Sequence, residues 1–386
     1  MVQYLTHDLI IHLVLFQMVV LVMILSNLLI LHRTRRYAPP EDYPMVSILI
    51  PARNEERTIS RCVNSLLAQD YPSFEILVWD DESTDGTPGI LNQIAEEQPK
   101  LKVLTGMPSP EDRSGKNWAC GQLSRHAQGT FLFFTDADTV HHPHCLREIV
   151  ATLIHEPADL ITGFPRQQMI GWTEKLLVPF FTWASISFIP LWLAYRVRSK
   201  ALTAAVGQVM MFRRDAYERI GGHDALGSAI VDDLILARRI KAAGLRWRVV
   251  RVSDLVTCRM YHTGREVIQG FTKNLFAAFD FRLLIYSFVF LWLAVLFLTP
   301  IVILPMFVFG YAPNANSQEL IISMVLSLLL WIIPYWETGV PLYLAFLYPV
   351  TVLAIEGVAL RSLFSSLTGT LSWKDRKLAK PKWKWL

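Results

Sequence analysis

The feature that most restricts the fold of this chain is a nearly unbroken apolar run from Leu9 to Leu31. A helix of about 20 residues spans a bilayer, so the run is long enough to cross one. A cleaved signal peptide fits poorly, because no basic segment precedes the run and Arg33 follows it. We therefore expect a membrane anchor whose N-terminus lies outside and whose Arg33 lies in the cytoplasm.

The last third of the chain is apolar again over three segments, Leu283 to Tyr311, Leu320 to Pro334 and Val340 to Leu360. The stretch 373–386 that follows them carries six basic residues and one acidic residue, which is typical of a cytoplasmic flank. Both basic flanks then lie on one side, which requires an even number of crossings between them. We therefore expect one of the three segments to be re-entrant or interfacial.

The composition agrees with a membrane protein. Hydrophobic residues make up 52% of the 386 residues and charged residues 18%, below the roughly 25% usual for soluble domains. The formal charge of +4 is concentrated in the two flanks, which leaves a net charge of −4 for the rest of the chain. A nucleic-acid-binding protein more often spreads basic residues over its body, so no nucleic-acid partner is expected. The four cysteines show no metal-binding spacing and are expected to be reduced.

Between Tyr43 and Arg282, short apolar runs alternate with segments of helical spacing. Strands are expected at 46–50, 74–79, 101–104, 130–134 and 159–162, and helices at 58–69 and 90–97. This alternation predicts an α/β fold with a mixed, mostly parallel sheet whose ligands bind beyond the carboxyl ends of the strands. The apolar stretch from Leu176 to Tyr195 is expected to form a pair of helices at the membrane surface.

Acidic residues follow the ends of these expected strands. Glu55 follows the first strand, Asp80 and Asp81 the second, and Asp136 and Asp138 the fourth. Any one alone is typical of a solvated loop, but several at one sheet edge favour a hard divalent cation, Mg²⁺ or Mn²⁺, that would bridge a diphosphate. No G-x-G-x-x-G follows the first strand and no G-x-x-x-x-G-K-[ST] occurs, which argues against a Rossmann dehydrogenase and a P-loop NTPase.

Six segments together resemble, in order, the motifs of family 2 glycosyltransferases. They are PARNEE (51–56), WDDESTDGT (79–87), GKNWACG (115–121), TDAD (135–138), GQVMMFRRDAYERIGGHD (207–224) and VDDLILARRIKAAG (231–244). The resemblance covers the chain from Pro44 to Asn274, and the ordered set is far more specific than any one motif. It implies a GT-A fold and an inverting transfer of a sugar from a nucleotide-sugar.

The resemblance also implies roles for single residues at the strand ends. The nucleotide-sugar pocket would be lined by Pro51, Ala52, Arg53, Glu55, Asp81, Lys116 and Asp136. Asp81 would pair with the base, and Lys116 would lie near the nucleotide or its phosphates. Asp136 and Asp138 resemble the family's DxD pair, with Asp138 preferred as the direct ligand of Mg²⁺ or Mn²⁺.

Asp232 and Asp233 occupy the place of the family's Glu-Asp pair, which implies that Asp233 is the general base. The aspartate at 232 departs from the family pattern and leaves the role of that residue open. An inverting displacement needs one base for the acceptor hydroxyl and positive charge for the leaving diphosphate. The alternative interpretation is that both aspartates only cap the helix that follows them.

Processive members of the family carry Q-x-x-R-W after this region. Here Gln269 is followed by Gly270, Phe271, Thr272 and Lys273, so the Arg-Trp pair is replaced. This departure favours a single transfer over polymerisation. Lys273 is a candidate for a contact with the diphosphate, and a solvated helix lysine is the equally weighted alternative.

The stretch from Cys258 to Phe279 resembles bacterial carotenoid glycosyltransferases of the chlorobactene glucosyltransferase type. This resemblance implies transfer of one sugar from a UDP-sugar to a hydroxyl of a membrane lipid. UDP-glucose is the preferred donor and a carotenoid is the preferred acceptor. One alternative is another lipid acceptor: a hopanoid, diacylglycerol, a ceramide-like lipid or a polyprenyl phosphate. A second alternative is a non-catalytic membrane assembly protein with a decayed transferase domain.

These expectations together describe an integral protein of the bacterial cell membrane. The anchor is expected at 1–37, a cytoplasmic GT-A domain at 38–282 with interfacial helices near 172–198, and a C-terminal membrane region with its tail at 283–386. Aromatic side chains at the interfacial segment, among them Trp172 and Trp183, either guide a lipid toward Asp233 or anchor the domain at the headgroups.

Overall fold

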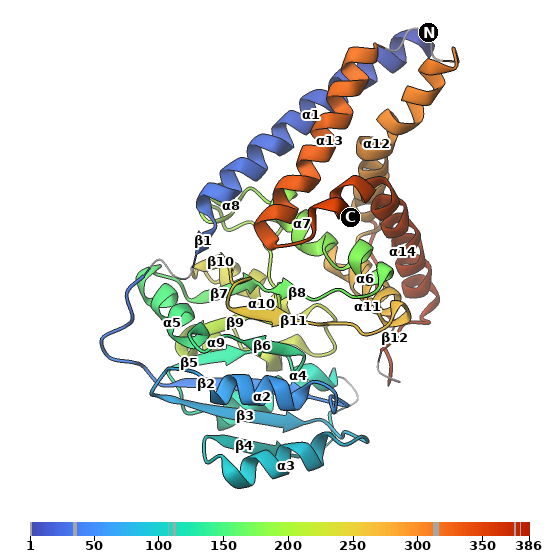
Figure 1. Cartoon of the computed structure of the whole chain (residues 1–386). Helices are drawn as coiled ribbons and strands as arrows, with labels where there is room; N and C mark the ends of the chain where they lie inside the picture. Colours follow the sequence, from blue (N-terminus) through green and yellow to red (C-terminus); the bar gives the residue numbers. More distant parts are fainter. Residues whose placement is uncertain are drawn as a thin grey trace. The chain divides into compact units, whose positions relative to one another are not determined.

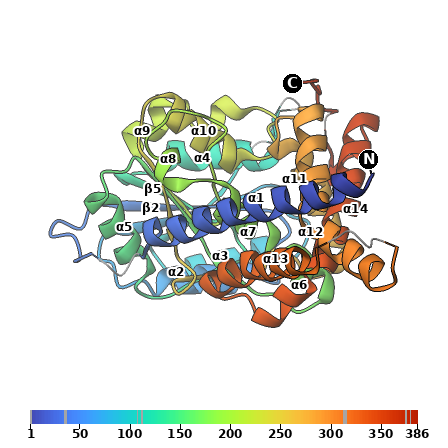
Figure 2. The same cartoon turned by 90° about the horizontal axis from the view of Figure 1, so that it is seen from above.

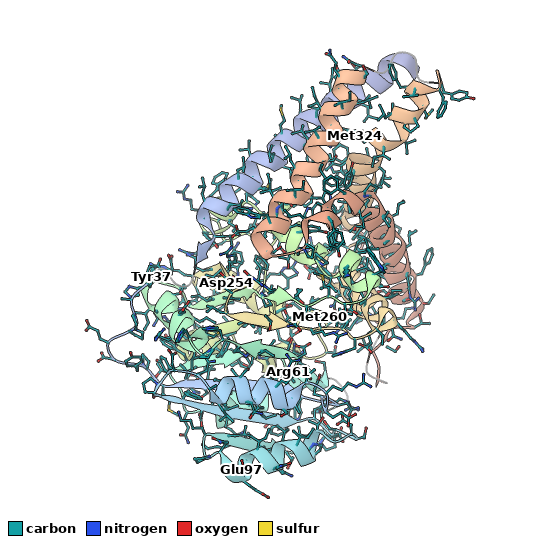
Figure 3. All side chains as sticks on the ribbon, viewed as in Figure 1. Tyr37, Arg61, Glu97, Asp254, Met260 and Met324 are labelled. Carbon is teal, nitrogen blue, oxygen red and sulfur yellow. The ribbon has the colours of Figure 1, made fainter. Side chains whose placement is uncertain are left out.

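The chain forms two compact units in a computed structural model that describes residues 2–33, 37–106, 108–110, 113–311, 316–373, 376–378 and 380–386. The α/β unit comprises 30–168 and 191–260, and the helical unit comprises 1–29, 169–190 and 261–386. Met260, labelled in Figure 3, is the last residue of the α/β unit. Arg35 and Arg36 of the first basic flank and Lys374 of the second lie outside the described residues.

An eight-stranded sheet forms the centre of the α/β unit, and its strands lie in the order β1-β10-β7-β9-β5-β2-β3-β4 (Figure 1). The strands are β1 (His32–Arg33), β10 (Trp247–Arg251), β7 (Leu160–Phe164), β9 (Met210–Arg213), β5 (Phe131–Phe134), β2 (Val46–Ala52), β3 (Phe74–Asp80) and β4 (Leu101–Thr105). All pairs are parallel except those that β9 makes with β5 and β7. The prediction of a mixed, mostly parallel sheet is therefore confirmed.

The five strands expected from the apolar runs are all present. Strand β2 continues through Pro51 to Ala52, two residues beyond the expected end. A proline is tolerated there because β5 pairs with β2 only as far as Leu49, so no partner on that side needs the missing N–H group. The antiparallel strand β9 had no expected counterpart, because its MMFR sequence is too short to show a period.

Helices cover both faces of this sheet. Helix α2 (Ile59–Leu67), helix α3 (Thr87–Glu97) and helix α5 (Cys145–His155) share one buried core with Ile48, Ile76 and Phe133. Helix α4 (Gly115–His126) packs on β2 and β3 from the other face, which also carries α9 (Arg214–Arg219), the 3₁₀ helix η2 (His223–Leu226) and α10 (Asp232–Ala242). Successive side chains of each strand point to opposite faces of the sheet, and here helices bury both faces.

A small second sheet continues the α/β unit beyond the end of β5. It contains β6 (Thr139–His141), β11 (Val256–Cys258) and β8 (Arg166–Gln167), with β11 in the middle. Because β6 and β11 pair antiparallel from Thr139 to His141, they hold the turn 135–138 between the two sheets. The short helix α8 (Leu191–Ala194) completes the unit.

The helical unit contains α1 (Val2–Ile30), α6 (Trp172–Leu177), α7 (Phe180–Phe188), α11 (Gly264–Ala278), α12 (Leu283–Val308), α13 (Ser317–Thr338), the 3₁₀ helix η3 (Leu342–Leu347), α14 (Tyr348–Thr368) and a short hairpin of β12 (Ser372–Trp373) and β13 (Arg376–Lys377). Within the described residues, four spans are long and apolar enough to cross a membrane: Asp8–Ile30, Leu283–Val308, Ser317–Thr338 and Leu342–Thr368. The expectation of apolar helices at both ends of the chain is confirmed.

Helices α1 and α13 run side by side in both views (Figures 1 and 2). Near the start of both helices, Ile10 and Leu320 meet Phe307 from the end of α12. Further along, the Gln17 amide donates to the Ser327 hydroxyl at 2.9 Å. Polar contacts of this kind join helices where neither water nor a hydrophobic driving force is present. The first helix is therefore an integral member of the bundle.

Helix α14 begins beside the middle of this bundle. The Tyr348 ring lies 5.9 Å from that of Phe297 and 6.3 Å from that of Trp331. Eleven residues later the carbonyl of Ala359 accepts a hydrogen bond of 2.8 Å from the hydroxyl of Tyr286, near the start of α12. The segment 342–368 therefore runs from mid-height toward the start of α12, antiparallel to that helix.

The apolar stretch 176–195 forms three short helices, α6, α7 and α8, where a pair was expected. Trp172 is exposed, whereas Trp183 is fully buried and stacks on Trp331 with ring centroids 3.9 Å apart. Its indole nitrogen donates to the carbonyl of Leu330 at 2.9 Å. Trp183 is therefore a packing residue of the helical unit and contacts neither headgroups nor a passing lipid. The position of these helices at a membrane surface stays a prediction.

Candidate active site

Two loops at the carboxyl ends of β2 and β3 are tied together by side chains. The Asn54 amide oxygen accepts from the backbone N–H of Thr84 at 2.8 Å, and the Ser83 hydroxyl accepts from the backbone N–H of Asn54 at 2.9 Å. The backbone N–H of Glu55 donates to the Thr87 hydroxyl at 2.8 Å. Asn54 has a φ of 52°, a left-handed conformation that asparagine tolerates better than most residues. These bonds give the sheet edge a fixed shape.

Arg53 and Asp81 lie on this edge: Arg53 follows Pro51 and Ala52 at the end of β2, and Asp81 follows the end of β3. The Arg53 guanidinium donates to the Asp81 carbonyl at 3.2 Å and lies 3.7 Å from its carboxylate. The Asp81 side chain is 8% exposed, and burial raises its pKa while Arg53 opposes the shift. The structure thus brings together Arg53 and Asp81, two of the residues expected to hold a nucleotide.

Lys116 connects carboxylates from two different elements. Its ammonium lies 2.9 Å from Oδ1 of Asp136, after β5, and 3.5 Å from Oδ2 of Asp232, at the start of α10. Burial opposes the charge, but these two carboxylates raise the pKa of Lys116 above its usual range. The lysine sits in the first turn of α4, where Ser114 caps the helix by accepting from the backbone N–H of Asn117.

Asp233 is held by backbone groups. Its Oδ2 accepts from the N–H of Gly207 at 3.0 Å and its Oδ1 from the N–H of Leu234 at 2.7 Å. Burial and then the neighbouring Asp232 raise the pKa of Asp233 above the usual range of an aspartate. A Cβ added at Gly207 would lie 3.5 Å from the Lys116 ammonium and 3.7 Å from Asp233 Oδ2. The ammonium and the carboxylate therefore border one small space.

The chemistry of Asp136 and Asp138 fits Mg²⁺ or Mn²⁺. Both carboxylates lie in the turn between β5 and β6, and hard oxygen donors are the ligands these cations prefer. The Cys258 thiol donates to Oδ1 of Asp138 at 3.4 Å, and burial raises its pKa, which favours the protonated donor form. In the part of the chain that the structure describes, no three His, Cys, Asp or Glu side chains form a metal site. Phosphate oxygens and water would have to complete the coordination.

Glu55 and Lys273 stand apart from the other expected site residues. Glu55 accepts a hydrogen bond of 3.0 Å from the Thr58 hydroxyl at the start of α2, so it supports the loop after β2. Lys273 lies on α11 in the helical unit, while the other expected site residues lie in the α/β unit. Contact of Lys273 with the diphosphate stays a prediction.

Sequence reasoning assigned no role to three residues around the carboxylates. Gly207 binds Asp233, the Asn117 amide donates to the carbonyls of Gly227 and Ala229 ahead of α10, and His223 lies 4.0 Å from Asp232. All three fall inside the motif segments, so the motifs alone were the available signal. Their contacts join distant parts of the chain and have no local pattern.

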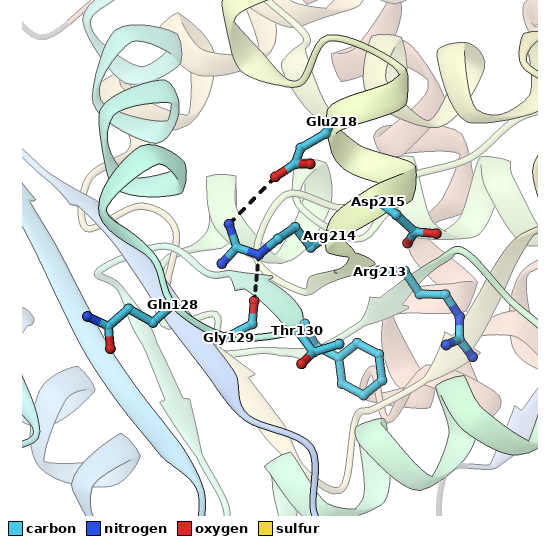
Figure 4. Close-up of a pocket in the computed structure, with 8 residues that line it drawn as sticks. Gln128, Gly129, Thr130, Arg213, Arg214, Asp215 and Glu218 are labelled. Carbon is cyan, nitrogen blue, oxygen red and sulfur yellow. Dashed lines mark hydrogen bonds and ion pairs between the residues drawn. The ribbon is translucent and has the colours of Figure 1, made fainter.

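A different pocket, of about 520 Å³, opens at the amino end of β5, away from these carboxylates (Figure 4). Arg214 in it donates to the carbonyl of Gly129 at 2.8 Å and lies 3.7 Å from the Glu218 carboxylate. Arg213 donates to the carbonyl of Ala158 at 3.0 Å. Since both guanidinium groups hold backbone in place, the pocket is a structural feature, and the carboxyl edge is the candidate active site.

The fold and the edge of carboxylates define a GT-A-type transferase domain. Residues 47–221 match the family model described as glycosyl transferase family 2, so the resemblance is confirmed over this part of the chain. A mannosyltransferase from Pyrobaculum calidifontis, solved in complex with GDP-Man and Mn²⁺, shares the fold with a TM-score of 0.51 and 19% identity. The match covers 94% of this chain and 100% of that one.

Two relatives act on lipids according to their names. A beta-monoglucosyldiacylglycerol synthase from Synechocystis sp. is 30% identical over 54% of this chain and 42% of its own length. A 4,4'-diaponeurosporenoate glycosyltransferase from Staphylococcus haemolyticus is 25% identical over 60% of each chain. This chain therefore matches less than two thirds of the length of either relative.

Proposed function

We propose that this protein is an inverting, metal-dependent glycosyltransferase of a membrane. It transfers one sugar from a nucleotide-sugar to a hydroxyl of a membrane lipid, and UDP-glucose is the preferred candidate for the donor. The observation that carries the proposal is the space at Gly207, which both the Lys116 ammonium and the Asp233 carboxylate border. Lys116 would then stabilise the charge of the leaving group, and Asp233 would take the proton of the acceptor hydroxyl.

Asp233 is the general base in this proposal. Two backbone N–H groups hold its carboxylate in one orientation, and its raised pKa makes it a better proton acceptor than an exposed aspartate. As the acceptor oxygen attacks the anomeric carbon, its proton passes to this carboxylate. One carboxylate suffices, because a direct displacement forms no covalent sugar–enzyme intermediate.

Lys116 stabilises the leaving diphosphate. Its ion pairs with Asp136 and Asp232 hold the ammonium in one position, which supports a role as a preorganised positive charge for the diphosphate. Asp136 and Asp138 would hold Mg²⁺ or Mn²⁺, which when bound supplies further positive charge to the diphosphate. Arg53 and Asp81, fixed by their mutual contacts, would bind the nucleoside of the donor.

A carotenoid is the first proposed acceptor, and the staphylococcal relative, whose name specifies a carotenoid carboxylate, supports the carotenoid body of the acceptor. Diacylglycerol is the second candidate, because the higher identity belongs to the glucosyldiacylglycerol synthase. Both acceptors present a hydroxyl on an apolar body, so both need a site that meets a membrane. The four apolar helices are consistent with that need.

The arrangement of the helical unit supports a cytoplasmic position of the α/β unit. Helices α1, α12 and α13 would make three full crossings, and η3 with α14 would enter only to the level of Phe297 and return. The backbone N–H of Leu283 donates to the carbonyl of Lys384 at 2.8 Å, so the basic tail lies at the start of α12. With two crossings between them, Arg33 and the tail face the same side, which the distribution of basic residues assigns to the cytoplasm.

The direct test is transfer of labelled glucose from UDP-glucose in membranes that contain the full chain, with hydroxylated carotenoid and diacylglycerol offered in separate reactions. Asp233→Asn is expected to lower kcat by at least about 100-fold, in the range of a lost general base. The labelled product distinguishes the two acceptors.

Asp254→Asn is the matched control, because this aspartate of the same unit is half exposed and its ion pairs with described residues are long, at 3.4 and 3.5 Å. Its activity should equal that of the unchanged protein. Transfer that persists in Asp233→Asn would contradict the assigned base, and no transfer from any UDP- or GDP-sugar would contradict the proposed function.

A further inference from the structure

His223 is a buried histidine beside the candidate active site that the proposed mechanism does not use. It begins η2 and is 3% exposed. Its ring lies 4.7 Å from the ring of Phe134, the last residue of β5, and 5.7 Å from that of Tyr217. Two glycines with positive φ, Gly221 at 78° and Gly222 at 49°, let the chain turn so that the imidazole points inward.

Hydrogen bonds define how the imidazole is oriented. The backbone N–H of His223 donates to the Tyr217 hydroxyl at 3.0 Å, and the same hydroxyl lies 2.7 Å from Nδ1 of His223. Burial lowers the pKa of His223 to about 4, so the ring is neutral at neutral pH. When the hydroxyl donates to Nδ1, the ring proton resides on Nε2.

The opposite ring nitrogen faces the aspartate whose role the sequence left open. Nε2 of His223 lies 4.0 Å from Oδ2 of Asp232, and this same oxygen lies 3.5 Å from the Lys116 ammonium. A distance of 4.0 Å is longer than a hydrogen bond, and contacts in active sites commonly shorten when substrate binds. Asp233, by contrast, is held by the N–H groups of Gly207 and Leu234.

We propose that His223 is a positioning residue, which presents its Nε2–H to Asp232 and keeps this carboxylate directed at Lys116. Asp232 is then the anchor of the lysine and takes no proton from the acceptor. The inference rests on the proposed function, because it assigns to Lys116 the diphosphate of the donor. It deepens that function by separating the duties of the two adjacent aspartates.

The test compares His223→Leu, which removes both ring nitrogens but leaves a side chain of moderate size, with His223→Gln, whose amide N–H replaces Nε2–H. In the transfer assay, His223→Leu is expected to lower kcat/KM for the sugar nucleotide about tenfold or more, as for loss of a hydrogen bond to a charged group, with the KM for lipid unchanged. His223→Gln should recover most of the kcat/KM that His223→Leu loses. His126→Leu is the control, because His126 is exposed and its ring nitrogen contacts the backbone carbonyl of Gln122, four residues earlier in the same helix.

A double-mutant cycle distinguishes positioning from a merely structural role. Binding of UDP, measured by calorimetry in EDTA, should weaken in His223→Leu and in Lys116→Met, and the pair should weaken it no further than Lys116→Met alone. The inference would be overturned if the two single variants weaken UDP binding by factors that multiply in the double variant. It would also be overturned if kcat/KM of His223→Gln is no higher than that of His223→Leu. If His223→Leu fails to accumulate, His223→Asn takes its place in the cycle, because asparagine does not reach the Nε2 position.

The same measurements separate this inference from the proposed function. In one outcome, transfer by the unchanged protein is lost in Asp233→Asn, but His223→Leu transfers sugar as fast as the unchanged protein. This outcome would refute the role of His223 alone. Absence of transfer by the unchanged protein, with UDP binding still coupled between His223 and Lys116, would refute the proposed function and leave the positioning intact.

Discussion

At the residue scale, the proposal that Asp233 is the general base predicts the pH range in which transfer occurs. Burial and the adjacent Asp232 raise its pKa, so the carboxylate gains its proton at a higher pH than an exposed aspartate does. A base acts only when deprotonated, so kcat/KM should fall as the pH drops through this raised pKa. A pH profile of transfer measures it, and activity that stays constant down to the usual aspartate range would contradict the assignment.

A substitution at Gly207 is expected to impair transfer without impairing folding. An added Cβ would meet Lys116 and Asp233 at ordinary contact distances of 3.5 and 3.7 Å, so Gly207→Ala should fold normally. It would also occupy the space that the reacting groups need, and we expect kcat to fall at least about tenfold, because small displacements of reacting groups are costly. Transfer assays and thermal unfolding of the same preparations test both parts.

Gly89→Ala is the matched control for this substitution. Nothing lies within 4 Å of a Cβ at Gly89, which sits in helix α3, so this change should stabilise the protein by about 0.5–1 kcal/mol and leave transfer unchanged. Full activity of Gly207→Ala would show that the reacting atoms meet elsewhere.

At the element scale, the end of α14 and the turn between α12 and α13 should lie on opposite sides of the membrane. Cysteine placed at Tyr311, which is 80% exposed after α12, should react with an impermeant maleimide from outside intact cells. Cysteine placed at Thr370, after α14, should react only after permeabilisation. The four native cysteines are buried and give a low background. Labelling of both positions from outside would mean that 342–368 crosses fully.

The elements of the α/β unit could be predicted to different degrees. Strands β2, β3 and β5 are mostly apolar and almost entirely buried, so their composition located them within one or two residues. The motif carboxylates Asp136 and Asp138 could be placed at a strand end for the same reason. Strand β9 could not, because its four residues show no period and only pairing with β5 and β7 makes them a strand.

At the scale of the whole molecule, the protein should change the lipids of the cell that makes it. A transferase that adds one sugar and lacks the Arg-Trp element of processive enzymes should yield a lipid heavier by one hexose residue. Mass spectrometry of lipid extracts from cells with and without the protein tests this, with Asp233→Asn as the inactive reference. A ladder of several added hexoses would contradict single transfer.

The amino-acid sequence by itself determined the class of this protein: apolar spans at both ends, an α/β domain with carboxylates at strand ends, and the ordered motifs of family 2 glycosyltransferases. These features are local, since each is a composition or a spacing along the chain. The tertiary structure decided what the residues do together. Lys116 joins Asp136 to Asp232, Gly207 holds Asp233, and η3–α14 enters the bundle only to mid-height. Such contacts join residues tens to more than a hundred positions apart, and only folding brings them together.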